Sequence, residues 1–144
     1  MKFLSTILIF VFLLSCTTSA QEKKNPLAGT TWDLTSMKNV REDTTTTFPN
    51  SPSDQAIMIF GKTHYSFVHQ DTSRDANSGS SFTYKVDGDN FTAIPQMYNA
   101  LEAIGKPVKL KFKIEGDQLF FEATDWHFGG HDYKSFHQVW KRID

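Results

Sequence analysis

Histidines and aspartates crowd a short stretch near the C-terminus, and they are the residues of this chain best suited to bind a metal ion. The stretch carries Asp125, His127, His131, Asp132 and His137. Imidazole and carboxylate groups are suitable ligands for Zn²⁺, and a tight glycine turn could bring two of the histidines together. No cysteine supports such a site, and the pattern specifies no third ligand. We therefore expect exposed loop residues here and no metal site.

Other catalytic patterns are missing from the sequence. A nucleophilic triad needs a serine or cysteine with a base and an orienting acid, but the single cysteine, Cys16, lies near the N-terminus and no Gly-x-Ser-x-Gly motif occurs. A phosphate-binding loop needs a glycine-rich turn that opens a helix, and the two Gly-Asp turns are not followed by one. The sequence thus predicts neither an enzyme nor a cofactor.

Aromatic side chains at alternate positions are a better indication of function. A strand places alternate side chains on the same face, so each of three segments presents two large side chains together. If those faces point into a barrel, they form the apolar lining, with a few polar groups, that small-molecule sites have. A filled core without a cavity fits equally well, and the histidine of the set could be an ordinary half-buried residue. The candidate ligand-binding residues are Tyr65, Phe67, His69, Phe82, Tyr84, Phe112 and Ile114.

The first twenty residues resemble an export signal, so we do not expect them to belong to the folded domain. Met1-Lys2 is a positive start, and Phe3 to Leu14 is an apolar run. That run is shorter than the ~20 residues of a membrane-spanning helix and has the length of the core of a secretory signal. Leu13 to Cys16 reads as a lipobox, which would make Cys16 a lipidated N-terminus; a cut after Ala20 is the alternative.

Residues 21–26 are then a polar, disordered tether, and residues 27–144 form one domain. A cut after Ala20 leaves the mature chain without a cysteine, and neither cut leaves a disulfide. The stability of the fold therefore rests on its core. We expect an exported protein that is either anchored to a membrane by a lipid or is periplasmic or secreted.

The domain reads as a series of short strands. In Val108 to Glu115, apolar side chains alternate with Lys109, Lys111, Lys113 and Glu115, which indicates a strand with one buried and one wet face. Turn signals with glycine separate this strand from its neighbours. The further predicted strands are Thr30 to Met37, Gln55 to Phe60, Thr63 to His69, Ser80 to Val86, Asn90 to Ile94, Gln118 to Asp125 and Tyr133 to Ile143. A short helix is expected within 96–104, ended by Gly105.

About eight strands with short connections predict an all-β fold. Closing such an antiparallel, up-and-down series into a barrel removes its unpaired edges, and an eight-stranded barrel is wide enough either for its own side chains or for one small ligand. A β-sandwich is the structural alternative.

Four segments resemble the lipocalin-like domain family of small exported bacterial β-barrel proteins. They are Leu27 to Trp32, Thr83 to Thr92, Gly105 to Asp117 and Gln138 to Ile143, in the order in which that family has them. The resemblance implies a barrel and suggests small-molecule binding, without implying an established activity. It also implies that Trp32 of the first strand and Arg142 of the last meet at the closed end, where a guanidinium can stack on an indole.

The long polar loop from Asn39 to Asp54 is expected at the opposite, open end of the barrel. Phe48 is its only aromatic residue, so we predict that Phe48 folds inward as a lid over the ligand. Counting strands, we place the other long connections, 70–79, 95–107 and 127–132, near the closed end.

The charge balance excludes one class of partner. With 15 basic and 16 acidic residues, the formal net charge is −1, and no basic cluster of the kind that binds nucleic acid occurs. We expect a non-catalytic protein that holds a small hydrophobic molecule, the alternative being an accessory lipoprotein with a filled barrel core.

Overall fold

The computed structural model describes residues 24–49, 51–72 and 76–144. The predicted signal, Cys16 and the first half of the predicted tether lie outside these ranges. In the described part of the chain, no helix is long and apolar enough to cross a membrane.

The described residues form nine antiparallel strands and one 3-10 turn. Eight of the strands form a closed barrel, because β1 pairs with β3 on one side and with β9 on the other. The ninth, β2, pairs with the second half of β1, beyond the point where β3 leaves it. The elements are β1 (Thr30–Val40), β2 (Thr45–Phe48), β3 (Gln55–Phe60), β4 (His64–Asp71), β5 (Ala76–Asp87), β6 (Asn90–Met97), η1 (Leu101–Ala103), β7 (Val108–Glu115), β8 (Gln118–Phe128) and β9 (His131–Arg142).

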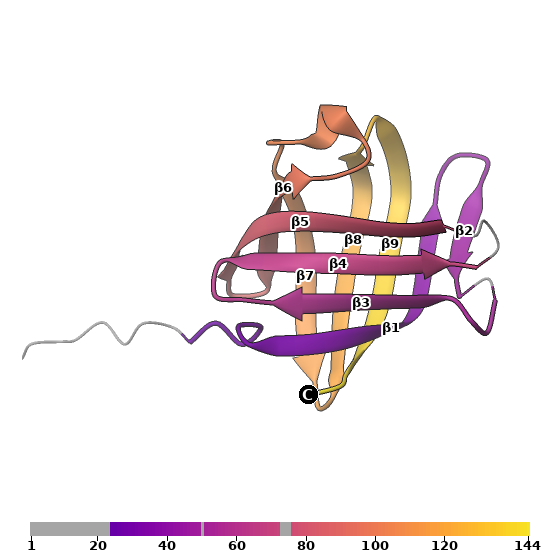
Figure 1. Ribbon diagram of the computed structural model, residues 1–144. Coiled ribbons are helices and arrows are strands. Elements are labelled where there is room, and N and C mark those ends of the chain that lie inside the picture. The colour runs from indigo at the N-terminus through magenta and orange to yellow at the C-terminus, as the bar shows by residue number, and fades with distance from the viewer. Residues whose placement is uncertain (1–23, 50, 73–75) are drawn as a thin grey trace, which may run out of the picture.

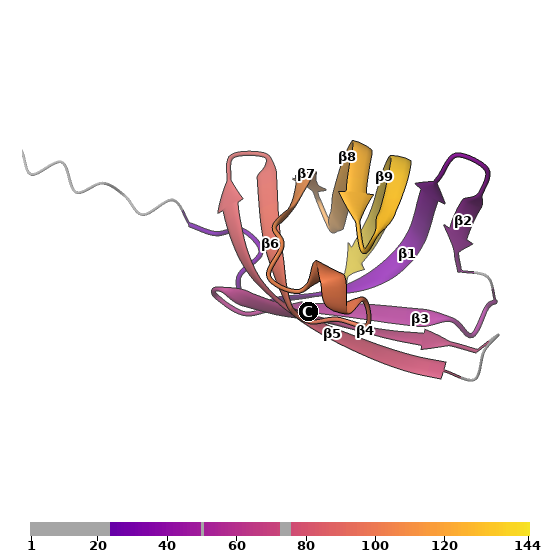
Figure 2. The same ribbon diagram turned by 90° about the horizontal axis from the view of Figure 1, so that it is seen from above.

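The barrel is flattened into two layers. Strands β3, β4 and β5 cross the front of Figure 1 at a steep angle to β7, β8 and β9 behind them. Seen from above in Figure 2, β1 curves from the first layer to the second. A register shift between Leu34 and Ser36 marks the bend on β1, as bulges commonly do where a strand turns a barrel corner. The predicted all-β, eight-stranded antiparallel barrel is confirmed.

The core lies between the two layers and is mainly aromatic. Its fully buried members include Trp32, Phe60, Phe91, Phe121 and Trp140. Rings of this size bury about 150–250 Å² each, which lets a domain without disulfides exclude water from its centre.

Several predicted elements keep their bounds and others change. β3 and β7 begin and end at the predicted residues. The expected loop from Asn39 to Asp54 contains β2, and the expected loop from Gln70 to Gly79 is largely strand, because β5 begins at Ala76 and pairs with β4. The helix predicted within 96–104 is reduced to η1, because β6 continues to Met97 and too few residues remain to nucleate an α-helix.

All the long connections lie at one end of the barrel, the open end, where the connection from Asn39 to Asp54 was expected. The predicted placement of 70–79, 95–107 and 127–132 near the closed end is wrong. Two strands separate each long connection from the next, and two antiparallel strands return the chain to the end from which it started. Contacts bear this out. Asp54 accepts hydrogen bonds from the backbone N–H (3.1 Å) and the hydroxyl (2.7 Å) of Thr72. A Cβ at Gly129 would lie 3.6 Å from the Cβ of Ala100.

The opposite, closed end has tight turns at Gly61, Gly88 and Gly116. Gly88 and Gly116 both have a φ of 62°, a conformation that costs glycine little and suits tight hairpins. The segment before β1 fills this end of the barrel: Leu27 is fully buried, and the Asn25 amide donates a hydrogen bond of 2.8 Å to the hydroxyl of Tyr84.

Candidate functional site: an aromatic cavity at the open end

A cavity of about 260 Å³ occupies the half of the barrel nearer the open end. Small-molecule sites commonly have volumes of ~300–1,000 Å³, so this cavity suits a ligand at the small end of that range. Five of the eight residues predicted from the sequence to bind a ligand line it: Phe48, Tyr65, Phe67, His69 and Phe82.

The other three predicted residues, Tyr84, Phe112 and Ile114, do not line the cavity. The Tyr84 hydroxyl donates a hydrogen bond of 2.7 Å to the carbonyl oxygen of Gly61, at the closed end. Phe112 packs in the core against Phe91, and Ile114 pairs across the sheet with Leu119, next to the turn at Gly116. Alternation identifies which face of a strand is buried, but it carries no information on height along the barrel, and these three residues lie in the filled lower half.

The cavity wall is built from aromatic pairs. Tyr65 stacks on Phe82, with ring centroids 4.6 Å apart and planes within 2°. Phe82 in turn contacts Tyr98, at 6.0 Å. On the opposite wall, Trp126 contacts Phe136, at 4.8 Å. Stacked and edge-to-face rings hold one another in place, so the wall is shaped before any ligand arrives.

Phe48 closes one side of this wall from β2. It is 6% exposed, and its ring contacts the ring of His69 edge to face at 5.4 Å. The side chain therefore points inward, as the sequence suggested, but it is carried by a strand and not by a loop.

Beside the phenols and His69, one cluster of polar side chains lines the cavity, on the neighbouring strands β1 and β9. Asn39 and Gln138 both donate weak hydrogen bonds of 3.5 Å to the sulfur of Met37. The side-chain oxygen of Gln138 accepts a bond from the Trp140 indole. The side-chain oxygen of Asn39 is buried and has no hydrogen-bond partner within the described residues. Because a buried polar atom without a partner costs free energy, the Asn39 amide has bonding capacity left for a ligand.

Sequence reasoning missed Asn39, Trp126 and Phe128 because irregularities in two strands reverse the alternation. On β1, Trp32 and Leu34 face inward, and after the shift near Thr35 the inward positions are Met37 and Asn39. On β8 the change falls at Asp125, which has a φ of 48°. Counting every second residue through a bulge puts the wrong side chains inside.

Burial raises the pKa of two phenols in the wall. For Tyr65 the cause is loss of hydration, with a smaller contribution from the nearby Tyr98; for Tyr98 it is again burial, with a smaller contribution from Tyr133. Both phenols stay neutral at physiological pH and present hydroxyl groups, not charges, to the cavity.

A second, more polar hollow of about 410 Å³ adjoins the cavity at the open end. Tyr98, Phe128 and Tyr133 line both spaces. Arg41, at the end of β1, and His131, at the start of β9, supply its basic groups. The Arg41 guanidinium lies 4.9 Å above the Tyr133 ring and donates a hydrogen bond of 3.0 Å to its hydroxyl.

At the closed end, Trp32 and Arg142 lie opposite each other on paired strands. The guanidinium carbon is 5.8 Å from the centre of the fully buried indole ring. The Trp32 N–H donates a hydrogen bond of 2.6 Å to the Thr30 hydroxyl. The two side chains that the resemblance paired are therefore in contact, and the indole blocks this end.

Two histidines of the C-terminal stretch, His127 and His137, point outward, whereas His131 lines the polar hollow. His127 and Asp132 are 2.7 Å apart and both largely exposed, and His137 lies 3.3 Å from Glu122 on the outer face of the sheet. Within residues 24–49, 51–72 and 76–144, no three histidine, cysteine, aspartate or glutamate side chains are grouped closely enough to hold a metal ion.

Comparisons with known proteins agree with this fold. No family model matches the sequence, and no curated protein matches it. A solved structure that is similar is a lipocalin-like protein from Bacteroides uniformis ATCC 8492, determined at 1.79 Å resolution. The two structures superpose with a TM-score of 0.52 over 81% of this chain and 98% of that one, at 13% sequence identity. This chain therefore has the fold of a bacterial lipocalin-like protein.

Proposed function

We propose that this protein binds a small hydrophobic molecule in the aromatic cavity. The cavity itself is the observation that carries the proposal. It lies in an otherwise well-filled barrel, is walled by paired rings, and has few polar groups, which is the composition of small-molecule sites. The rigidity of the wall favours binding, because little order is lost when the ligand enters.

The neutral dye N-phenyl-1-naphthylamine tests the proposal. We expect saturable binding with a blue shift of its emission, at one dye per chain, and displacement by lipids. Weak, non-saturable binding would favour the alternative function, an accessory barrel with no ligand.

A matched pair of substitutions locates the dye. Val108 lines the cavity, whereas Val68 lies on the outer face of β4 and is 51% exposed. Val108→Phe should occupy part of the cavity and weaken dye binding by more than about tenfold, because the added ring takes space that the dye needs; tenfold corresponds to about 1.4 kcal/mol. Val68→Phe adds the same bulk outside and should leave the affinity unchanged. Equal effects of the two substitutions would exclude the cavity as the binding site.

We also propose that the protein is exported and anchored to a membrane through Cys16. The support is the sequence alone: an apolar segment of signal length ends in a lipobox-like Leu13 to Cys16. The anchor and the cavity are independent proposals, since the first concerns residues outside the described ranges.

A further inference from the structure

The cavity has a cationic neighbour that a purely apolar ligand would leave unused. Arg41 is half-buried at the open end, one aromatic ring away from the cavity, because the ring on which it stacks, Tyr133, lines the cavity as well. Within the described residues Arg41 forms no ion pair with a carboxylate. A guanidinium that is taken wholly out of water needs such a partner, and a bound anion that covers Arg41 would supply it.

The position of Arg41 is fixed by its contacts. The hydrogen bond of 3.0 Å to the Tyr133 hydroxyl and the stacking distance of 4.9 Å hold the guanidinium plane over the ring. A guanidinium has five N–H donors, and the Tyr133 hydroxyl uses one. The remaining donors are free for an anion in the polar hollow, where Asn99 and His131 add further polar groups.

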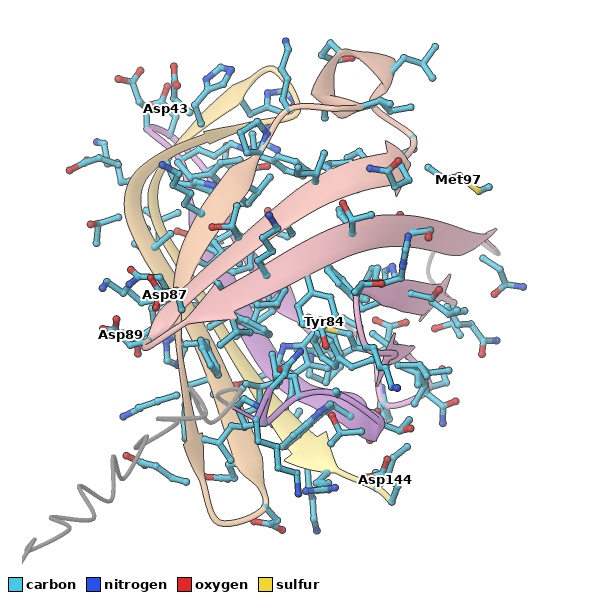
Figure 3. All side chains as sticks on the ribbon, turned by 90° about the vertical axis from the view of Figure 1, so that its left-hand side faces the viewer. Asp43, Tyr84, Asp87, Asp89, Met97 and Asp144 are labelled. Carbon is cyan, nitrogen blue, oxygen red and sulfur yellow. The ribbon has the colours of Figure 1, made fainter. Side chains whose placement is uncertain are left out.

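The nearest acids on the same hairpin do not neutralise Arg41. Glu42 and Asp43 follow it in the turn between β1 and β2 and are exposed. Figure 3 shows Asp43 at the outer tip of this turn. Exposed acids are screened by water and salt, so an anion bound between Arg41 and the aromatic wall would have the stronger interaction.

We propose that the ligand is an anionic amphiphile: an apolar body that enters the aromatic cavity, and one carboxylate- or sulfonate-like head that Arg41 binds in the polar hollow. This inference rests on the proposed function, since it needs the cavity to take the apolar body. It assigns Arg41 as the residue that selects charged over neutral ligands, with Tyr133 as the residue that positions it.

Two dyes with the same aromatic body separate the two proposals. N-phenyl-1-naphthylamine is neutral, and 1-anilinonaphthalene-8-sulfonate carries a sulfonate on the same rings. We expect Arg41→Gln to weaken binding of the sulfonate dye about tenfold, which corresponds to the loss of one charge-assisted hydrogen bond. Binding of the neutral dye should stay within about twofold of the wild type. Added salt should weaken binding of the sulfonate dye to the wild type, and it should weaken binding to the variant much less.

Control variants test whether the effect is local. Lys38 is an exposed residue of β1, three positions before Arg41. Lys38→Gln removes the same charge from the outer face and should change neither affinity by more than about twofold. Arg41→Lys keeps the charge without the planar fork and should retain part of the sulfonate affinity. It also provides a folded comparison if the glutamine variant proves unstable.

The outcomes are distinct for the two proposals. If the wild type binds neither dye, both proposals fail. A different outcome is that the wild type binds the neutral dye saturably while Arg41→Gln leaves the affinity for the sulfonate dye unchanged, or lowers the affinities for both dyes equally. In either case the proposed cavity site stands and the anionic amphiphile is excluded as its ligand.

Discussion

At the scale of single residues, Asn39 combines a cost to stability with a capacity for binding. Its buried side-chain oxygen has no partner among the described residues. A buried polar atom in that state costs ~1–3 kcal/mol. Because Asn39 also lines the cavity, a ligand with a hydroxyl or amine would supply the missing partner, and this places the amide in the candidate site.

The substitution Asn39→Leu tests this use. A leucine of similar size removes the unpaired oxygen, so we expect the free energy of unfolding to rise by about 1 kcal/mol, measured by urea denaturation. The same variant should bind less tightly those cavity ligands that have a hydroxyl or amine, while the neutral naphthylamine dye keeps its affinity within about twofold. A loss of stability would show that the amide supports the fold.

The buried phenols predict a loss of stability at high pH. The pKa of Tyr65 and that of Tyr98 are both raised above the ordinary value of 10.0. As the pH rises above 10, the unfolded chain releases these protons first, so unfolding becomes more favourable. The stability is complete below pH 10 and falls above it, by about 1.4 kcal/mol per pH unit for Tyr65 until the pKa of the folded state is reached, and Tyr98 adds to the loss in the same direction.

Urea unfolding across this pH range measures the slope, and Tyr65→Phe provides the control. The variant lacks one of the groups, so its stability should fall less steeply above pH 10 than that of the wild type. Ultraviolet absorbance should show phenolate forming together with unfolding. Equal slopes in the two proteins would mean that Tyr65 ionises freely in the folded state.

At the scale of elements, β2 is a short strand that carries one large side chain into the cavity wall. Phe48→Ala should weaken binding of the neutral dye, because the wall loses the ring that contacts His69. We expect a destabilisation of about 2 kcal/mol, less than the ~3–5 kcal/mol of a fully enclosed phenylalanine, because one side of the ring faces the cavity. Dye titration and urea denaturation measure the two effects.

Phe48→Leu is the matched variant. It keeps an apolar side chain at the position and should retain most of the affinity and stability. An unchanged dye affinity in Phe48→Ala would remove Phe48 from the binding site and leave it a role only in the core.

The bounds of some strands could be predicted from the sequence, and the bounds of others could not. The bounds of β7 follow from its alternation of apolar and charged residues, which matches the pleat of a half-buried strand. The beginning of β5 at Ala76 could not be predicted, because Ala76 to Gly79 has no large apolar side chain and the pairing with β4 is made by backbone groups alone. The alternation of side chains carries no information on which backbone groups pair between strands.

The candidate site could be predicted in part for the same physical reason. Tyr65, Phe67 and Phe82 lie in regular strands, where alternation identifies the inward face. Asn39 and Trp126 follow irregular positions, at Thr35 and Asp125, which shift the inward face by one residue. Arg41 was missed because its role depends on Tyr133, which is 92 positions away in the sequence.

At the scale of the whole molecule, the barrel keeps its filled end apart from its cavity. The closed end is filled by Leu27, Trp32 and their hydrogen-bonded neighbours, whereas the cavity lies toward the other end. We expect Leu27→Ala to destabilise the fold by about 2–4 kcal/mol, because Leu27 is fully buried. At a temperature where the variant remains folded, its affinity for the neutral dye should equal that of the wild type. A parallel loss of affinity would show that the two ends are coupled.

The predicted membrane anchor also belongs to the whole molecule. Cys16→Ser removes the thiol that a lipid would modify, so we expect the variant to move from the membrane fraction to the soluble fraction, since each buried CH₂ of an acyl chain contributes ~0.8 kcal/mol to membrane binding. Fractionation of cells followed by mass spectrometry of the mature N-terminus measures this. A wild-type protein that is soluble and begins at Gln21 would contradict the prediction.

The gathering of every long connection at one end has a consequence for how such a chain can be altered. The tight turns at Gly88 and Gly116 leave little room for insertion, whereas the connections around Arg41, Ser53 and Asn99 lie at the open end and do not contribute to the closed end. Replacing those three stretches with varied sequences would produce a library of barrels that share one core and differ in what they recognise. The same geometry would let natural descendants acquire new ligands while the half of the barrel that holds it folded stays unchanged.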